Sequence, residues 1–79
     1  MIRLYNLDHC PYCRKVREVL SELALDYELI EVPKERETRT EVFAVSGQYF
    51  VPVLLDGDIM IADDDEKAIA YLRDAYEKK

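Results

Sequence analysis

The sequence is short of basic residues, histidine and cysteine, and each shortage excludes a class of function. In 79 residues, 11 Lys and Arg stand against 17 Asp and Glu, which gives a net charge of -6. Binding to a phosphate backbone needs a basic surface, so we expect no nucleic-acid partner. A tetrahedral zinc site needs four ligands, and the only histidine, His9, and the two cysteines supply at most three nearby. We therefore expect no metal ligands within one chain.

The two cysteines, Cys10 and Cys13, are too few and too close together to form a disulfide framework. Small secreted domains normally carry four or more cysteines, and bridging two such close residues removes little chain entropy. Residues 1–6 also lack the long apolar stretch of a signal peptide or a membrane span. We therefore expect a cytoplasmic protein that does not bind membranes, in which a cysteine pair is catalytic or metal-binding.

Length and composition favour one globular domain over residues 1–79. Hydrophobic residues make up 49% and charged residues 35%, a balance typical of folded proteins. Alternating apolar residues predict strands, and apolar residues at every third or fourth position predict helices. The expected elements are strands at residues 2–6, 27–32, 51–55 and 59–61, and helices that begin at Pro11, after a charged loop at 34–41, and after the acidic residues 63–65.

Local signals indicate how these elements connect. The first β-α-β unit predicts two parallel strands joined by a right-handed crossover helix. Asp56-Gly57 is a two-residue hairpin signal, so the last two strands should be antiparallel. Ser46-Gly47 is expected to end the second helix. The sequence thus predicts an α/β protein of order β-α-β-α-β-β-α, with a four-stranded mixed sheet flanked by helices.

The chemistry is concentrated in the motif Cys10-Pro11-Tyr12-Cys13. A Cys-x-x-Cys pair that enters a helix beside a β-α-β unit is typical of thioredoxin-like redox proteins. Cys10 precedes the helix, where free N–H groups and the helix dipole stabilise a thiolate. Cys13 falls one turn later on the apolar face, so we expect it to be more buried and less reactive. A stabilised thiolate is also a good leaving group, so the pair suits repeated thiol–disulfide exchange.

Other interpretations of these residues stay open at this point. The cysteines are alternatively two core residues, or ligands of a metal or cluster shared between two chains. Tyr12 either covers the loop or contacts substrate, and His9 is expected to be an exposed neighbour that modulates Cys10. Pro52 interrupts a strand-like run, so it is either an ordinary strand-initial proline or a cis proline. In the second case the backbone of Val51 is presented to an extended thiol peptide.

These motifs resemble those of a glutaredoxin over nearly the whole chain. The resemblance is carried by Cys10-Pro11-Tyr12-Cys13, by residues 46–52 (Ser-Gly-Gln-Tyr-Phe-Val-Pro), by Asp56-Gly57 and by the acidic residues 63–65. Residues 52–58 and 68–72 also resemble the N-terminal domain of glutathione transferases. That enzyme class needs an added helical domain for its second substrate, and we expect this chain to lack one. The resemblance implies a thioredoxin fold with sheet order 2-1-3-4.

The resemblance also implies roles for individual residues. Cys10 would be the nucleophile and Cys13 the resolving thiol. Pro52 would be a cis proline, with the backbone of Val51 binding that of glutathione. We add Tyr12 as a substrate contact. The acidic pair Asp64 and Asp65 would receive the γ-glutamyl end of glutathione, with Asp63 as the alternative if the register shifts by one residue.

Some positions depart from the usual glutaredoxin pattern. Leu7 stands where many members carry a basic residue, and Phe50 replaces the Thr that usually precedes Val-Pro. Ile61 and Ala62 stand near the position of a usual Gly-Gly. Arg39 is expected on a solvated helix face, with a glutathione carboxylate as its less favoured partner. These departures leave the redox chemistry intact and leave the identity of the thiol partner open.

The leading hypothesis is a cytoplasmic, monomeric thiol–disulfide oxidoreductase that reduces protein or glutathione mixed disulfides through Cys10 and Cys13. It needs no bound cofactor, and its co-substrate is glutathione or another low-molecular-weight thiol. One alternative is a protein electron donor recharged by a thioredoxin-reductase-like flavoenzyme. Another, from a different class, is a dimeric metal or iron–sulfur carrier, which Pro11 makes less favoured by family resemblance.

Overall fold

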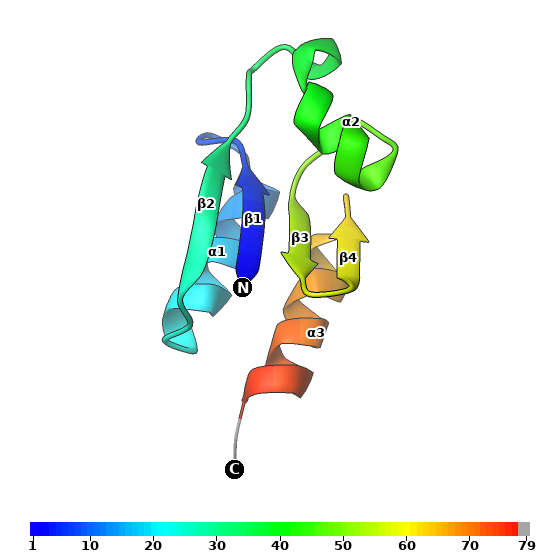
Figure 1. The fold of residues 1–79 in the computed structure, drawn as a ribbon. Coiled ribbons are helices and arrows are strands. Elements are labelled where there is room, and N and C mark those ends of the chain that lie inside the picture. The colour runs from blue at the N-terminus through cyan, green and yellow to red at the C-terminus, as the bar shows by residue number, and fades with distance from the viewer. Residues whose placement is uncertain (78–79) are drawn as a thin grey trace.

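Strand β1 (Ile2–Asn6) is a central strand of the sheet and buries four of its five side chains. The computed structural model describes residues 1–77. β1 pairs in parallel with β2 (Tyr27–Glu31) and antiparallel with β3 (Val53–Asp56), which pairs antiparallel with β4 (Ile59–Ala62). The strand order β2-β1-β3-β4 confirms the predicted mixed sheet of a thioredoxin fold (Figure 1).

Helix α1 (Pro11–Glu22) is the crossover between the parallel strands β1 and β2. Pro11 occupies its first position, where the missing N–H would have no acceptor in the helix anyway. Cys13, Val16 and Leu20 are fully buried, as their helical spacing predicted. The opposite face of α1 carries charged residues in contact with solvent.

The middle of the chain differs in detail from its prediction. The charged segment 34–41, predicted as a loop, contains a 3-10 turn at Arg36–Thr38 and the first residues of α2 (Thr40–Ser46). Gly47 ends α2 with a φ of 76°, a left-handed value that favours glycine. β3 begins at Val53 and not at residue 51, because a proline at 52 has no N–H to donate to a neighbouring strand.

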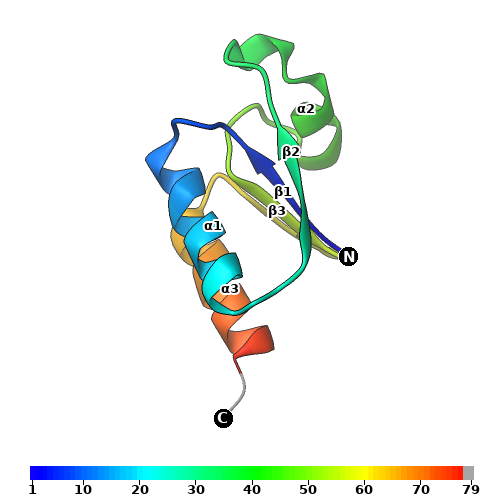
Figure 2. The same cartoon turned by 90° about the vertical axis from the view of Figure 1, so that its left-hand side faces the viewer.

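The helices form layers on the two sides of the sheet. Figure 2 shows α1 and α3 (Asp65–Tyr76) side by side on one face, with α2 on the other side. Successive residues of β1 point to opposite faces, so Leu4 packs in the core under α1 and α3 while Tyr5 packs in the core near α2. Within residues 1–77 no helix is both long enough and apolar enough to cross a membrane.

Asp56 joins α3 to the β3–β4 hairpin. Its Oδ2 accepts hydrogen bonds from the hydroxyl of Tyr71, at 2.7 Å, and from the hydroxyl of Tyr76. The hydrogen bonds from Tyr76 and then Tyr71 hold the pKa of Asp56 below its ordinary value. The same carboxylate raises the pKa of Tyr71 to about 12 and raises that of Tyr76. The three side chains therefore stabilise one another in their usual charge states.

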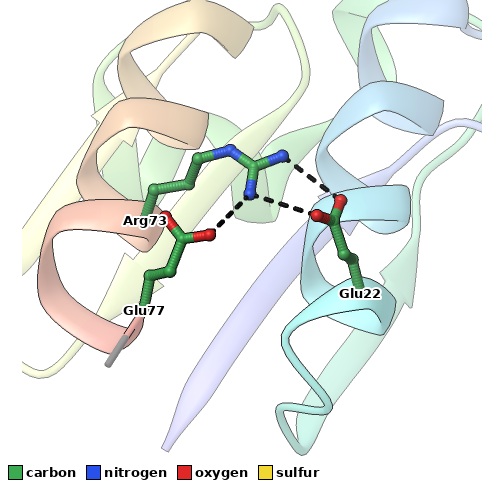
Figure 3. Close-up of polar contacts among 3 residues, drawn as sticks. All are labelled: Glu22, Arg73 and Glu77. Atoms are coloured by element: carbon green, nitrogen blue, oxygen red, sulfur yellow. Dashed lines mark hydrogen bonds and ion pairs between the residues drawn. The ribbon is translucent and has the colours of Figure 1, made fainter. Parts of the chain in front are cut away.

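A second set of polar contacts joins α3 to the last turn of α1 (Figure 3). The Arg73 guanidinium donates to both carboxylate oxygens of Glu22, at 3.2 and 3.3 Å, and to Glu77 at 3.5 Å. The hydrogen bond and the charge of Glu22 raise the pKa of Arg73. Two parallel N–H donors on one carboxylate fix the relative positions of the helices at this end.

Candidate active site

The predicted site residues come together at one end of the sheet. Tyr5 lies opposite Val53, and Val53 lies opposite Ala62, so β1 and β4 end where β3 begins. The segments that follow β1, precede β3 and follow β4 therefore meet there (Figure 1). The N–H of Asp63 donates to the carbonyl of Pro52 at 2.9 Å, which joins two of these segments directly.

Cys10 is the N-cap residue of α1 and is partly exposed. Its backbone is extended, with φ of -85° and ψ of 118°, and its side chain forms no capping hydrogen bond. Its N–H donates to the carbonyl of Leu7, and its carbonyl accepts from the N–H of Arg14, both at 3.0 Å. The backbone is thus held at both sides while the sulfur stays accessible at the positive end of the helix dipole.

Cys13 lies one turn into α1 and has no exposed surface. Desolvation, together with the hydrogen bond and the charge of the neighbouring Cys10, raises the pKa of the Cys13 thiol to about 12. The hydrogen bond with the Leu7 backbone, second in size to desolvation, and the weaker charge effect of Arg17 lower the pKa of Cys13. At neutral pH Cys13 is therefore a protonated thiol next to Cys10. Cys13 is also the more buried of the two cysteines, as the sequence predicted.

A polar network that the sequence analysis missed holds the loop before Cys10. Glu31 accepts hydrogen bonds from the side chain of Asn6 at 2.8 Å and from the N–H of Asp8 at 2.7 Å. Arg17 of α1 donates to the side-chain oxygen Oδ1 of Asn6 at 2.5 Å. Asn6 and Glu31 are aligned at the ends of two parallel strands. The polar residue at the end of each strand was the sequence signal that could have predicted this contact. These contacts orient the loop and α1 relative to the sheet.

The peptide bond between Val51 and Pro52 is cis, which confirms the prediction from family resemblance. Val51 is almost fully buried, in the same apolar cluster as Cys13, and Cys10 packs against that cluster. Within the described chain the N–H and C=O of Val51 form no hydrogen bond. Val51 therefore has two unpaired backbone groups and lies in the cluster that contains Cys13 and packs against Cys10.

The three aspartates 63–65 have different local roles. Asp63 adopts a left-handed φ of 55° and bonds to Pro52 through its backbone. Asp64 is the N-cap of α3, and its carboxylate accepts the N–H of Lys67 at 3.0 Å. Asp65 is the first residue of α3, and its side chain is 17% exposed. Asp64 and Asp65 are thus the two carboxylates at the start of α3.

Tyr12, in the first turn of α1, and His9, in the loop before Cys10, are both exposed. The Tyr12 residue is 55% exposed, and the ammonium of Lys15 lies 5.8 Å from the centre of its ring. The His9 imidazole is 85% exposed and lies 3.8 Å from the carboxylate of Asp8. An open cavity of about 490 Å³ begins beside Cys10 and is bounded in part by His9. In residues 1–77 no group of three or more His, Cys, Asp or Glu is placed to hold a metal ion.

Arg39 was predicted on a solvated helix face, and that prediction is wrong. The residue is only 5% exposed, and its three guanidinium nitrogens donate to three backbone carbonyls. These are the carbonyls of Pro33 at 2.8 Å, of Lys34 at 3.1 Å and of Tyr49 at 3.1 Å. The structure therefore also gives no support to the alternative prediction that Arg39 binds a carboxylate of glutathione. Arg39 instead fixes the segment after β2 against the segment that leads to Val51.

Comparison with known proteins agrees with this geometry. An uncharacterized glutaredoxin-like 8.6 kDa protein in the rubredoxin operon of Clostridium pasteurianum is 34% identical over 62 residues, 77% of this chain and 83% of that protein. The glutaredoxin grx-1 of Archaeoglobus fulgidus is 33% identical with a TM-score of 0.70, over 91% of this chain and 85% of that one.

Glutathione transferases are also similar to this chain, over part of their length. A glutathione transferase homologue from Drosophila mojavensis, solved with bound glutathione, is 33% identical with a TM-score of 0.87. The match covers 99% of this chain and 36% of that one, so this chain spans about a third of the transferase length.

The fold and the cysteine pair define a glutaredoxin-like protein of the thioredoxin fold. The chain belongs to the family of glutathione S-transferase N-terminal domains, and the family model matches residues 4–79. Both resemblances expected from the sequence are thereby confirmed.

Proposed function

We propose that the protein is a thiol–disulfide oxidoreductase that reduces protein or glutathione mixed disulfides. The observation that carries this proposal is the difference between the two cysteines. Cys10 is accessible at the start of α1, whereas Cys13 is fully buried and holds its proton at neutral pH. One thiol is thus placed to meet a substrate, and the other is placed to react only with its neighbour.

The reaction takes place in two exchanges. The Cys10 thiolate attacks one sulfur of a substrate disulfide, forming a mixed disulfide and releasing the other sulfur as a thiolate, which takes up a proton. Cys13 then loses its proton and attacks the Cys10 sulfur, which releases the second substrate thiol and leaves a Cys10–Cys13 disulfide. Two molecules of a low-molecular-weight thiol such as glutathione reduce this disulfide and leave as their own disulfide.

Glutathione fits the groups around Cys10 as a substrate or co-substrate. The free backbone groups of Val51 can pair with its extended main chain, and its γ-glutamyl end would reach Asp64 and Asp65. Tyr12 would lie over the bound peptide. A transferase homologue of similar fold was solved with bound glutathione, which supports glutathione as the ligand. Cytoplasmic location and a monomeric state belong to the same proposal.

A protein reductant is the second candidate, and the surface around Phe50 favours it. Phe50 is 45% exposed, directly before Val51, and the Arg36 guanidinium lies 4.6 Å from the centre of its ring. Aromatic residues are enriched at protein contact surfaces. In that case a flavin disulfide reductase would replace glutathione. The class-changing alternative, a shared metal or iron–sulfur cluster, predicts a coloured dimer after anaerobic purification.

Single serine variants of the two cysteines test the proposal. Cys10→Ser should abolish reduction of both a glutathionylated peptide and an intramolecular protein disulfide, because it removes the attacking thiol. Cys13→Ser should still reduce the glutathionylated peptide when glutathione is supplied, but lose the protein disulfide. Full activity in Cys10→Ser would disprove the mechanism. Comparing glutathione plus its reductase with thioredoxin reductase as the electron source then distinguishes the two candidates.

A further inference from the structure

Lys15 lies between two of the residues proposed to contact substrate. Its Nζ is 3.8 Å from Oδ2 of Asp65 and 5.8 Å from the centre of the Tyr12 ring. The Lys15 side chain is 57% exposed, whereas that of Asp65 is 17% exposed. The lysine therefore bridges α1 and α3 on the side of the molecule where Cys10 begins the helix.

Within residues 1–77, Asp65 differs from the two aspartates before it in having a cationic side chain beside it. Asp64 accepts a backbone N–H of its own helix, and Asp63 is exposed, with a backbone bond to Pro52. Lys15 supplies the charged partner of Asp65. A substrate ammonium that approached Asp65 would find the Lys15 ammonium already beside the carboxylate.

We propose that Lys15 is a specificity-determining residue that disfavours substrates carrying an ammonium group at the Asp65 end. The site then prefers thiols and disulfides that are neutral or anionic at that position over the unmodified γ-glutamyl end of glutathione. This inference rests on the proposed function. Two cations compete for one carboxylate, and the mobile lysine side chain can be displaced, so discrimination is partial.

A pair of matched substrates isolates the ammonium group. One peptide carries a glutathione mixed disulfide, and the other carries the N-acetyl-glutathione mixed disulfide, in which a neutral acetamide replaces the ammonium group at that end. For Lys15→Gln we expect kcat/KM for the first peptide to rise about twofold to fivefold through a lower KM, the range of an exposed ion pair. The N-acetyl peptide has no ammonium to compete with Lys15, so its kcat/KM should not rise, and the ratio of the two constants reports the competition.

Lys67→Gln is the matched control, because it removes a lysine charge from the first turns of α3 without removing the contact to Asp65. It should leave the ratio of the two kcat/KM values unchanged. Raising the ionic strength should shrink the difference between wild type and Lys15→Gln, which a purely steric role would not cause. An unchanged or opposite ratio in Lys15→Gln, with wild type active on both peptides, overturns the inference alone. A wild type that reduces neither peptide overturns the proposed function as well.

Discussion

The two ends of the α1–α3 helix pair carry inter-helix ion pairs that differ in the number of contacts and in distance. At the end far from the cysteines, Arg73 holds both oxygens of Glu22 at 3.2 and 3.3 Å (Figure 3). At the cysteine end, Lys15 makes one contact with Asp65 at 3.8 Å. Arginine has a planar set of donors that matches a carboxylate, whereas lysine is a point charge on a flexible stem. The closed contact holds the two helices together, and the open one leaves Asp65 able to exchange partners.

The far end also contains the Asp56 cluster, in which the Asp56 carboxylate accepts hydrogen bonds from Tyr71 and Tyr76. At the site end, by contrast, the backbone groups of Val51 form no hydrogen bond within residues 1–77, and the side chain of Cys10 makes no capping bond there. Fixed contacts at one end thus hold the scaffold, while unfilled contacts at the other are available to a ligand.

The largest expected effect comes from the apolar core that both ends share. Leu72 of α3 has no exposed surface and packs in the cluster between the sheet and α1. Leu72→Ala should lower the free energy of unfolding by about 2–5 kcal/mol, because it leaves a cavity. Urea denaturation measures the loss, with Leu29→Ala, at a half-exposed position, as the control. A loss in Leu72→Ala no larger than in the control would mean that polar contacts hold the helices.

This core was predictable from the sequence, because apolar spacing depends on local periodicity. The helical spacing of Val16 and Leu20 and the hairpin signal at Asp56-Gly57 were enough to predict the elements and their order. The start of β3 was misjudged by two residues, because Val51 has the composition of a strand but precedes a proline that cannot donate.

The site was predictable only in part, since motifs identify residues but not their long-range partners. The cysteine pair and Pro52 follow from spacing and family resemblance. Arg39 binds three carbonyls from two separate segments, and no local pattern indicates such contacts. The Asn6–Glu31 bond depends on the register of two strands that are far apart in the sequence. The partnership of Lys15 with Asp65 likewise needs the packing of α1 on α3.

The Asp56 cluster should give the next largest effect and a distinctive pH profile. Asp56→Asn should cost about 2 kcal/mol, because two hydrogen bonds to a charged acceptor become bonds to a neutral one. The lowered pKa of Asp56 means that its contribution is present above the ordinary value of 3.8 and is lost as pH falls below it. The raised pKa of Tyr71 means that the contribution is present below 10.0 and is lost as pH rises towards about 12.

Thermal unfolding of wild type and Asp56→Asn across this pH range checks both limits. The difference between the two proteins should be largest between about pH 5 and 9 and should shrink at each extreme. Asp58→Asn, an exposed neighbour in the same hairpin, is the control and should show neither change. A difference that is constant with pH would contradict the cluster's role.

The smallest effect is expected for the ion pair that defines the far end. Glu22→Gln removes the charge that pairs with Arg73, and both side chains are exposed to solvent. We expect a lower melting temperature than wild type at low ionic strength, by less than in Asp56→Asn, and no difference at 1 M salt, where exposed charges are screened. Glu18→Gln, which breaks a pair within α1 only, is the control. If Glu22→Gln also changed the selectivity between the two glutathione peptides, the ends of the helix pair would be coupled, and their separation into scaffold and site would be wrong.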